Sequence, residues 1–296
     1  MRQYQFPKIP KEAYQHRFGE AGRVKRLRSK AAFPMIDTYP HGMPLGGLGA
    51  GTIGRAPEGD FNVWHLIPGQ HIFETVPACQ FSVRQKIKQE DKVFATVLST
   101  TKLPEESPLS GWNWGYPAGA ATYHTLYPKA WTKYEHKKFP VKLQCTQFSP
   151  IIPHNYRETS FPVAVFKWNA YNPTEKIVEV SIMFTWQNMI GWKPAVPREG
   201  NAAGVTWDKV FTKASLNTKV ESGEFHGVIL SAPLSTDPNA LNGECCIAAH
   251  QVIGSKVCVQ AIFDCQNTGE YMWAEFVEKG QLSNYPNPDI DRKSVV

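Results

Sequence analysis

Two carboxylates that flank a glycine have the residue types and spacing of a catalytic pair. Glu58 and Asp60 lie two positions apart, and on an extended segment this spacing places both side chains on one face, about 7 Å apart. Carboxylate pairs at such separations hydrolyse glycosidic bonds. The adjacent Pro57 and Gly59 favour a turn instead, in which the carboxylates are ordinary polar turn residues. We therefore predict no catalytic residue at this position.

A glycine-rich segment precedes the two carboxylates and contains the pattern G-x-G-x-x-G over residues 49–54. In dinucleotide-binding proteins this pattern lays a pyrophosphate on the N-terminus of a helix. Here no buried strand precedes the pattern, and Pro57 and Gly59 would break a helix that followed it. The sequence therefore predicts no cofactor. It predicts that this segment forms a structural or substrate-adjacent loop. Its candidate residues are Gly46, Gly47, Gly49, Gly51, Arg55 and Asp60.

Metal-binding and nucleophile motifs are also missing from the sequence. The six cysteines are dispersed without a C-x-x-C pair, which gives no support to a zinc ribbon or a thioredoxin-like site. The closest histidines, His65 and His71, do not have the spacing of metal ligands on a helix. Neither G-x-S-x-G nor H-E-x-x-H occurs. We expect buried thiols and no metal site.

Length and composition indicate a globular protein with a substantial core. The chain has 296 residues, of which 42% are hydrophobic and 20% are charged. No run approaches the ~18 apolar residues of a membrane span, and the first residues lack the apolar core of a secretory signal. We therefore expect a cytoplasmic location.

The positive charge is concentrated at the N-terminus. Residues 1–30 carry nine basic and two acidic groups, a net charge of +7, whereas the whole chain has +6. The densest cluster, residues 23–30, would attract anionic lipid headgroups, or it is a solvated arm. No aromatic platform or binding motif accompanies it, so we predict no nucleic-acid partner. Residues 1–30 are expected to form a basic leader, with peripheral membrane contact as a candidate role.

The remainder of the chain reads as strands and turns. Alternating apolar residues predict a hairpin of residues 162–171 and 176–186 around Asn172 and Pro173. Further strands are predicted over Gln80–Val83, Val93–Ser99, Val141–Phe148, Gly227–Ala232, Cys245–Val252 and Lys256–Phe263. Helical periodicity is scarce. This pattern predicts an all-β fold, an antiparallel β-sandwich of two packed sheets with long aromatic loops and few helices.

Three tryptophans, Trp112, Trp114 and Trp131, lie in the aromatic loop region. Flat apolar rings beside polar neighbours are typical of sugar-stacking platforms. Tryptophans of a sandwich also pack in the core or at a domain interface. Both interpretations stay open at this point.

Several long segments of this sequence carry a resemblance to a known family. They are Gly42–Arg55, Gly59–Leu66, Cys79–Val83, Trp112–Trp114, Leu126–Tyr134, Phe148–Phe166 and Val180–Asn188. In this order, over roughly residues 39–282, they resemble the N-terminal domain of glycoside hydrolase family 116. This family contains the non-lysosomal glucosylceramidases and related β-glucosidases.

The resemblance implies a β-sandwich that precedes an all-helical toroid of six helical hairpins. It further implies that the toroid carries the Glu nucleophile and the Asp acid/base of a retaining glycosidase. Only fourteen residues follow Leu282, whereas twelve helices with their loops need roughly 200 residues. We therefore expect a sandwich over residues 31–282, a tail over 283–296 and no catalytic residue in this chain.

The function expected from this resemblance is support of an absent catalytic toroid that hydrolyses β-glucosides such as glucosylceramide. The expected partners are the toroid, in cis or in trans, and a β-glucoside or glycolipid. Two alternatives stay open: a stand-alone carbohydrate-binding module, and one half of a split enzyme that assembles in trans.

Overall fold

Two long strands with apolar residues at every second position form the centre of the fold. β8 (Gln80–Ile87) and β14 (Val178–Gln187) pair antiparallel, from Val178 opposite Ile87 to Thr185 opposite Gln80. β9 (Lys92–Val97) and β20 (Ser294–Val295) extend this sheet, whose order is β20-β14-β8-β9. Since side chains alternate between the faces of a strand, one face of β14 presents only apolar residues to the core.

A five-stranded sheet of order β1-β10-β11-β12-β13 faces the central one. Its strands are β1 (Tyr14–Arg17), β10 (Ala121–Leu126), β11 (Lys129–Tyr134), β12 (Lys142–Phe148) and β13 (Val165–Tyr171). The ring of Phe81 in β8 lies 5.0 Å from that of Phe166 and 5.2 Å from that of Trp168, both in β13. The two sheets therefore share one aromatic core, and the predicted antiparallel β-sandwich is confirmed.

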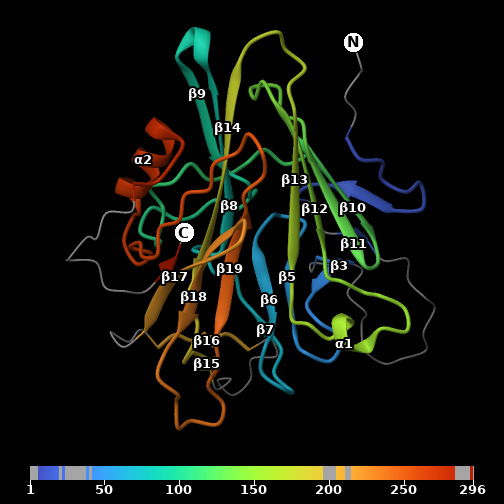
Figure 1. Ribbon diagram of the computed structural model, residues 1–296, viewed down its shortest axis with the longest axis vertical. Coiled ribbons are helices and arrows are strands. Elements are labelled where there is room, and N and C mark those ends of the chain that lie inside the picture. The colour runs from blue at the N-terminus through green and yellow to red at the C-terminus, as the bar shows by residue number, and fades with distance from the viewer. Residues whose placement is uncertain are drawn as a thin grey trace.

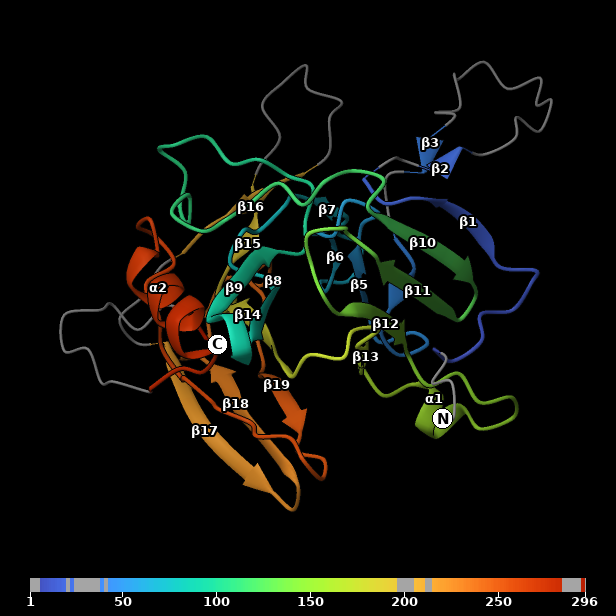
Figure 2. The ribbon, with the colours of Figure 1, turned by 90° about the horizontal axis from the view of Figure 1, so that it is seen from above.

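Smaller sheets complete the sandwich (Figure 2). One has the order β4-β5-β6-β7, another the order β17-β18-β19, and two are pairs, β15-β16 and β2-β3. The strands are β2 (Gly22–Arg23), β3 (Thr38–Tyr39), β4 (Pro44–Leu45), β5 (Thr52–Arg55), β6 (Phe61–His65), β7 (Ile72–Phe73), β15 (Lys193–Pro194), β16 (Trp207–Asp208), β17 (Leu216–Ser222), β18 (Phe225–Ser231) and β19 (Cys245–His250).

This computed structural model describes residues 6–19, 42–195, 205–210 and 215–283, with the backbone alone of 22–23, 38–39 and 294–295. Most of the predicted basic cluster at residues 23–30 lies outside these residues, so lipid contact there stays a prediction. Residues 14–17 form β1 and pair with β10. The sandwich therefore includes part of the predicted leader.

Helices are few among the described residues. They are η1 (Lys88–Glu90), α1 (Tyr156–Thr159) and α2 (Glu270–Lys279). α2 covers the outer face of the central sheet (Figure 1), where Met272, Trp273 and Phe276 pack with Val97 and Met183. None of these helices is long and apolar enough to cross a bilayer.

The predicted hairpin of residues 162–186 is wrong in its pairing. The two strands exist as β13 and β14, but β13 pairs with β12 and β14 pairs with β8, so the connection crosses between the two sheets. The Asn172 side chain organises this connection by donating to the carbonyl oxygen of Lys176 and accepting from the amide of Thr174. A turn signal fixes the reversal of the chain, but it does not fix which sheet receives the second strand.

The predicted strand over Lys256–Phe263 is also wrong. These residues form no ladder with a described strand, and side chains take over part of the backbone hydrogen bonding. The side-chain amide of Asn217 donates to the carbonyl oxygen of Ala261, and that of Gln260 donates to the carbonyl oxygen of Ile262. The other five predicted strands correspond to β8, β9, β12, β18 and β19.

Arg84 joins α2 to the central sheet, and its removal is expected to destabilise the protein. Its Nε donates to the carbonyl oxygen of Val277 at 2.7 Å, and an Nη donates to that of Glu278 at 2.9 Å. Arg84→Ala leaves both helix-end carbonyls without these donors, at a cost of about 2–3 kcal/mol in the free energy of unfolding. Chemical denaturation measures this cost. Lys88→Ala, which removes only an exposed ion pair with Glu179, should change it by less than about 1 kcal/mol.

Candidate functional site

The glycine-rich segment forms the loop between β4 and β5, and it leads into a strand. Gly54, the last glycine of the G-x-G-x-x-G pattern, lies within β5 itself. Gly46, Gly49 and Gly51 have positive φ values, of 149°, 76° and 86°. The pattern is therefore a tight β-hairpin loop, which lacks the helix N-terminus that a dinucleotide pyrophosphate needs.

This loop packs against the segment that joins β12 to β13. The amide of Gly46 donates to Ser149 Oγ at 2.7 Å, and the amide of Leu48 donates to the carbonyl oxygen of Thr159 at 2.9 Å. A Cβ on Gly47 would collide with the carbonyl oxygen of Ser160, whereas a Cβ on Gly49 would meet nothing within 4 Å. Gly47 thus permits the close approach of the two segments, and Gly49 supplies only the turn.

Arg55, a candidate of the predicted substrate-adjacent loop, is buried in the sandwich. Its Nε donates to the carbonyl oxygen of Gly59, and an Nη donates to the carbonyl oxygen of Leu98 and to the hydroxyl of Tyr134. Burial lowers the pKa of Arg55, but the interactions with Tyr134, Cys145 and Tyr123 together outweigh it and the net pKa is raised. The guanidinium is a permanent positive charge that ties the end of β5 to the β5–β6 turn, to the segment after β9 and to β11.

Asp60 is also buried in the sandwich and is 3% exposed. Its carboxylate accepts hydrogen bonds from Gln80 Nε2 at 2.8 Å, from Ser99 Oγ at 2.6 Å and from Thr101 Oγ1. All of these partners are internal. In this geometry the Asp60 carboxylate holds the β5–β6 turn to β8 and to the segment after β9, and a glycosidic bond cannot reach it.

Glu58 is the other half of the predicted pair, and it lies in the β5–β6 turn, where Gly59 has a φ of 100°. The two carboxylates therefore do not have the extended geometry of a catalytic pair. Burial raises the pKa of Glu58, and the nearby Asp60 charge adds to the increase. This makes Glu58 a source of pH-dependent stability.

The three candidate tryptophans pack inside the protein to different degrees. Trp112 and Trp131 are 4% and 6% exposed, and Trp114 is partly buried. Trp112 stacks on Trp273 of α2 at 5.6 Å and donates its Nε1 hydrogen to the carbonyl oxygen of Gly269. With their rings placed in this way, Trp112 and Trp131 have no open face for a sugar.

One end of the sandwich exposes apolar side chains on three neighbouring loops. We call this surface the apolar loop end. Leu48, Tyr127, Tyr156 and Phe161 are 56%, 60%, 73% and 49% exposed. Its members are Leu48, Leu126, Tyr127, Ile152, Tyr156, Phe161 and Val163.

Strand register explains why these loops lie together. Lys129 opposite Phe148, and Phe148 opposite Val165, place the β10–β11 turn and the β12–β13 segment at the same end of the sheet. The hydrogen bond from Leu48 adds the glycine-rich loop to this end. α1 marks its position in Figure 1. Exposed apolar side chains gathered on neighbouring loops in this way are typical of an interaction site.

Sequence reasoning did not find the apolar loop end as a surface. The available signal was the number of apolar residues scattered over 151–163, a segment that has neither strand nor helix periodicity and contains two prolines. Apolar residues in such a segment have no core face to occupy. Their gathering with Leu48 and Tyr127 depended on strand pairing that the sequence does not reveal.

The described residues contain no group of three His, Cys, Asp or Glu side chains that could hold a metal ion. The buried thiols are poor nucleophiles, because burial raises the pKa of Cys145 to about 12 and that of Cys79 well above its usual range.

Fold and site together define an antiparallel β-sandwich domain with one apolar end. A family model described as "beta-glucosidase 2, glycosyl-hydrolase family 116 N-term" matches residues 42–295. The chain therefore belongs to the family of glycosyl-hydrolase family 116 N-terminal domains, and the resemblance seen in the sequence is confirmed. The match includes the glycine-rich loop, the buried Arg55 and Asp60, and the apolar loop end.

The contact at Gly47 can be tested by comparing two glycines of the same loop. Gly47→Ala pushes a methyl group into the Ser160 carbonyl, and we expect a loss of about 1–3 kcal/mol in the free energy of unfolding. Gly49→Asn keeps a left-handed conformation that asparagine tolerates and should cost less than about 1 kcal/mol. Urea denaturation measures both. Equal losses would contradict the close packing assigned to Gly47.

Glu58 predicts a pH dependence of stability. The folded protein holds the Glu58 proton more tightly than the unfolded chain, so this group favours folding below its ordinary pKa of 4.5. That contribution is lost as the pH rises through the raised folded pKa. Glu58→Gln should therefore have a higher Tm than the parent at neutral pH, with the difference vanishing below pH 4.5. Thermal unfolding followed by circular dichroism tests this, with the exposed Glu106→Gln as control.

Proposed function

We propose that this domain is the non-catalytic support of a helical β-glucoside-cleaving domain, which docks on the apolar loop end. The observation that carries the proposal is the exposure of Leu48, Tyr127, Tyr156 and Phe161 on adjacent loops of one end. A monomeric domain rarely leaves such a surface uncovered. Family membership supports the nature of the partner, because family 116 N-terminal domains belong to glycosyl hydrolases.

In this proposal the glycine-rich loop positions the docking surface. Its backbone is fixed by bonds to Ser149 and Thr159, and β5, the strand that follows it, is fixed at its far end by Arg55. Leu48 at the tip is thus presented to a partner by a rigid support. The same surface serves a helical domain in cis or one supplied in trans.

The substrate and the location are further parts of the proposal. A β-glucoside, with glucosylceramide as one member of the class, would be cleaved by acid/base and nucleophile residues of the helical partner. We place the domain in the cytoplasm, which is supported by six cysteines that all remain thiols. Sugar stacking on Trp112 or Trp131 is less favoured, because both rings are buried.

Substitutions at the apolar loop end should weaken binding to the toroid domain of a family 116 enzyme. The double variant Leu48→Asp with Tyr156→Asp adds charge to two exposed side chains, and we expect an affinity loss of at least about tenfold. Ile177→Asp is the matched control, because Ile177 is 60% exposed at the opposite end of β13. Isothermal titration calorimetry with the purified toroid domain measures the affinity. Equal binding by both variants would refute docking at this end.

Aryl β-glucoside hydrolysis tests the non-catalytic role separately. The 296-residue chain alone should release no aglycone, and its addition should raise the activity or the thermal stability of the toroid domain. Steady hydrolysis by the chain alone, lost on heat denaturation, would overturn the proposal.

A further inference from the structure

The outer face of the five-stranded sheet carries basic side chains and no acidic ones. Its strands, β1 and β10 to β13, contain five basic residues and neither aspartate nor glutamate. We call the surface that these residues form the basic face. Its members are Arg17, Lys129, Lys133, Lys142 and Lys167.

Strand register places all five side chains on one face, because residues directly opposite each other in a sheet share a face. Arg17 lies opposite Thr122, and Thr122 lies opposite Lys133. Lys133 in turn lies opposite Gln144. The period of two along each strand adds the remaining members, Lys129, Lys142 and Lys167. Tyr134, next to Lys133 in β11, is 3% exposed in the core, so the basic face points away from the core.

Three lysines of the basic face have no carboxylate partner. Lys129, Lys133 and Lys167 form no ion pair with a described residue, whereas Lys142 Nζ lies 3.3 Å from a carboxylate oxygen of Glu135. Uncompensated like charges on one surface repel each other and produce a positive field above it. An anionic surface placed against this face relieves the repulsion.

The segment before β1 crosses the basic face and adds to its charge. It starts above β12, where Gln144 Nε2 donates to the carbonyl oxygen of Pro7 at 3.3 Å, and it ends where β1 joins β10. Lys8 and Lys11 on this segment are exposed, and Glu12 is its one acidic residue. The segment therefore increases the positive charge that the face presents.

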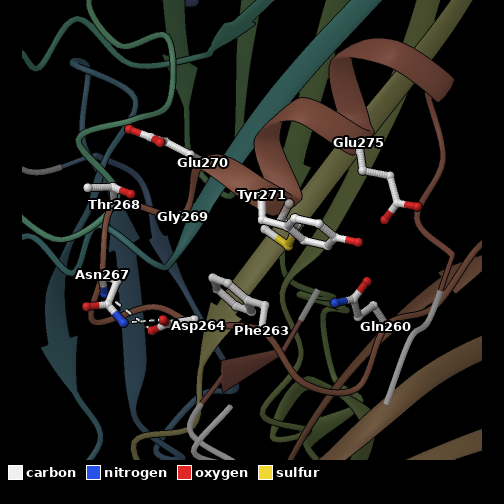
Figure 3. Close-up of a pocket in the computed structure, with 10 residues that line it drawn as sticks. Gln260, Phe263, Asp264, Asn267, Thr268, Gly269, Glu270, Tyr271 and Glu275 are labelled. Atoms are coloured by element: carbon white, nitrogen blue, oxygen red, sulfur yellow. Dashed lines mark hydrogen bonds between the residues drawn. The ribbon is translucent and has the colours of Figure 1, made fainter. Parts of the chain in front are cut away.

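Carboxylates gather on the other side of the molecule. A pocket at the start of α2 is lined by Asp264, Glu270 and Glu275 and by no lysine or arginine (Figure 3). Among the described residues, only Glu275 of these three pairs with a lysine, Lys279. Figure 2 shows α2 and the five-stranded sheet at opposite sides of the molecule. A negatively charged surface would therefore orient the protein with the basic face towards it.

The aromatic rings of the basic face are covered, which argues against a nucleic-acid partner. Trp131 is 6% exposed. The ring of Phe148 lies under Lys129 Nζ at 5.4 Å, and the ring of Tyr171 lies 6.1 Å from that of Phe6. Single-stranded nucleic acids bind to basic grooves whose rings are open for stacking on the bases.

The type of cation also distinguishes between partners. Four of the five basic residues in the sheet are lysines. Arginine is the residue that protein interfaces and nucleic-acid sites favour, because its planar fork binds carboxylate and phosphate at two points, whereas lysine is depleted at protein interfaces. Lysine is a hydrated point charge on a flexible stem, which suits mobile lipid headgroups that offer no fixed geometry.

We propose that the basic face binds the surface of an anionic lipid bilayer. Each lysine close to such a surface strengthens binding about fivefold. The cytoplasmic leaflet carries the required negative charge, which agrees with the location proposed above. The basic face runs along the strands and the apolar loop end lies at their ends, so this proposal does not depend on the docked helical domain. It is also separate from the lipid contact predicted for residues 23–30.

The test is co-sedimentation of the full 296-residue chain with lipid vesicles. We expect binding to vesicles that contain about one third phosphatidylserine, and no binding to vesicles of phosphatidylcholine alone. Raising the salt concentration from about 0.1 M to about 1 M should release the protein, because the Debye length falls to about 3 Å.

A triple variant assigns the binding to the basic face. Lys129→Gln with Lys133→Gln and Lys167→Gln removes three uncompensated charges, and we expect about 100-fold weaker binding to the phosphatidylserine vesicles. The corresponding triple substitution by arginine keeps the charges and should bind as the parent does. Thermal unfolding followed by circular dichroism checks that both variants fold.

The matched control removes three lysines that already pair with carboxylates outside this face. It combines Lys86→Gln, Lys88→Gln and Lys176→Gln, changes the net charge equally, and should weaken binding less than about fivefold. Equal losses in the two glutamine variants, or no binding of the parent to phosphatidylserine vesicles, would overturn the proposal. Tighter binding of the parent to single-stranded RNA or to poly-glutamate than to these vesicles would overturn it as well.

Discussion

Burial of β8 on both of its faces is the constraint on which the rest of the structure depends. Phe81 and Val83 point into the aromatic core between the two large sheets, while Arg84 reaches the end of α2 on the other side. A strand covered on both faces needs two layers of partners, and it receives them from β13 on one side and α2 on the other. The sandwich thus becomes a three-layer arrangement at this strand, and α2 is an integral part of the domain.

A buried polar network fixes the loops to this centre. Asp60 accepts from Gln80 at the start of β8 and from Ser99 after β9, and Arg55 reaches Leu98 and Tyr134. Each of these polar groups would be costly to bury alone, and together their bonds specify one position of the β5–β6 turn. The glycine-rich loop lies at the other end of β5. Because the buried charges of Arg55 and Asp60 fix one end of this strand, they also help to fix the position of the loop at its other end. The position of the loop and the packing of the core are therefore coupled through the β5–β6 hairpin.

The sequence predicted local features well and long-range pairing poorly. The period-2 alternation of β14 was visible because Val180, Ile182 and Phe184 all face the aromatic core, and the long family-like segments located the domain. The partner of β14 was not visible, because a turn at Asn172 looks the same whether the next strand pairs with β13 or crosses to β8. Lys256–Phe263 has the composition of a strand but no ladder partner among the described residues. Arg55 and Asp60 resembled surface loop residues, since a sequence does not show that Tyr134, Ser99 and Gln80 surround them.

The pairing of β8 with β14 has a consequence for how this domain is made. Ile87 cannot pair with Val178 until Val178 has been synthesised. At ~5–20 residues per second, the ribosome needs several seconds to synthesise the chain between them. During that interval β8 has only its hairpin partner β9, and its other edge and its apolar face are open to wrong contacts. Such distant pairing makes folding slow and dependent on late-synthesised residues. Until β14 is synthesised, β8 therefore has to be kept from aggregating.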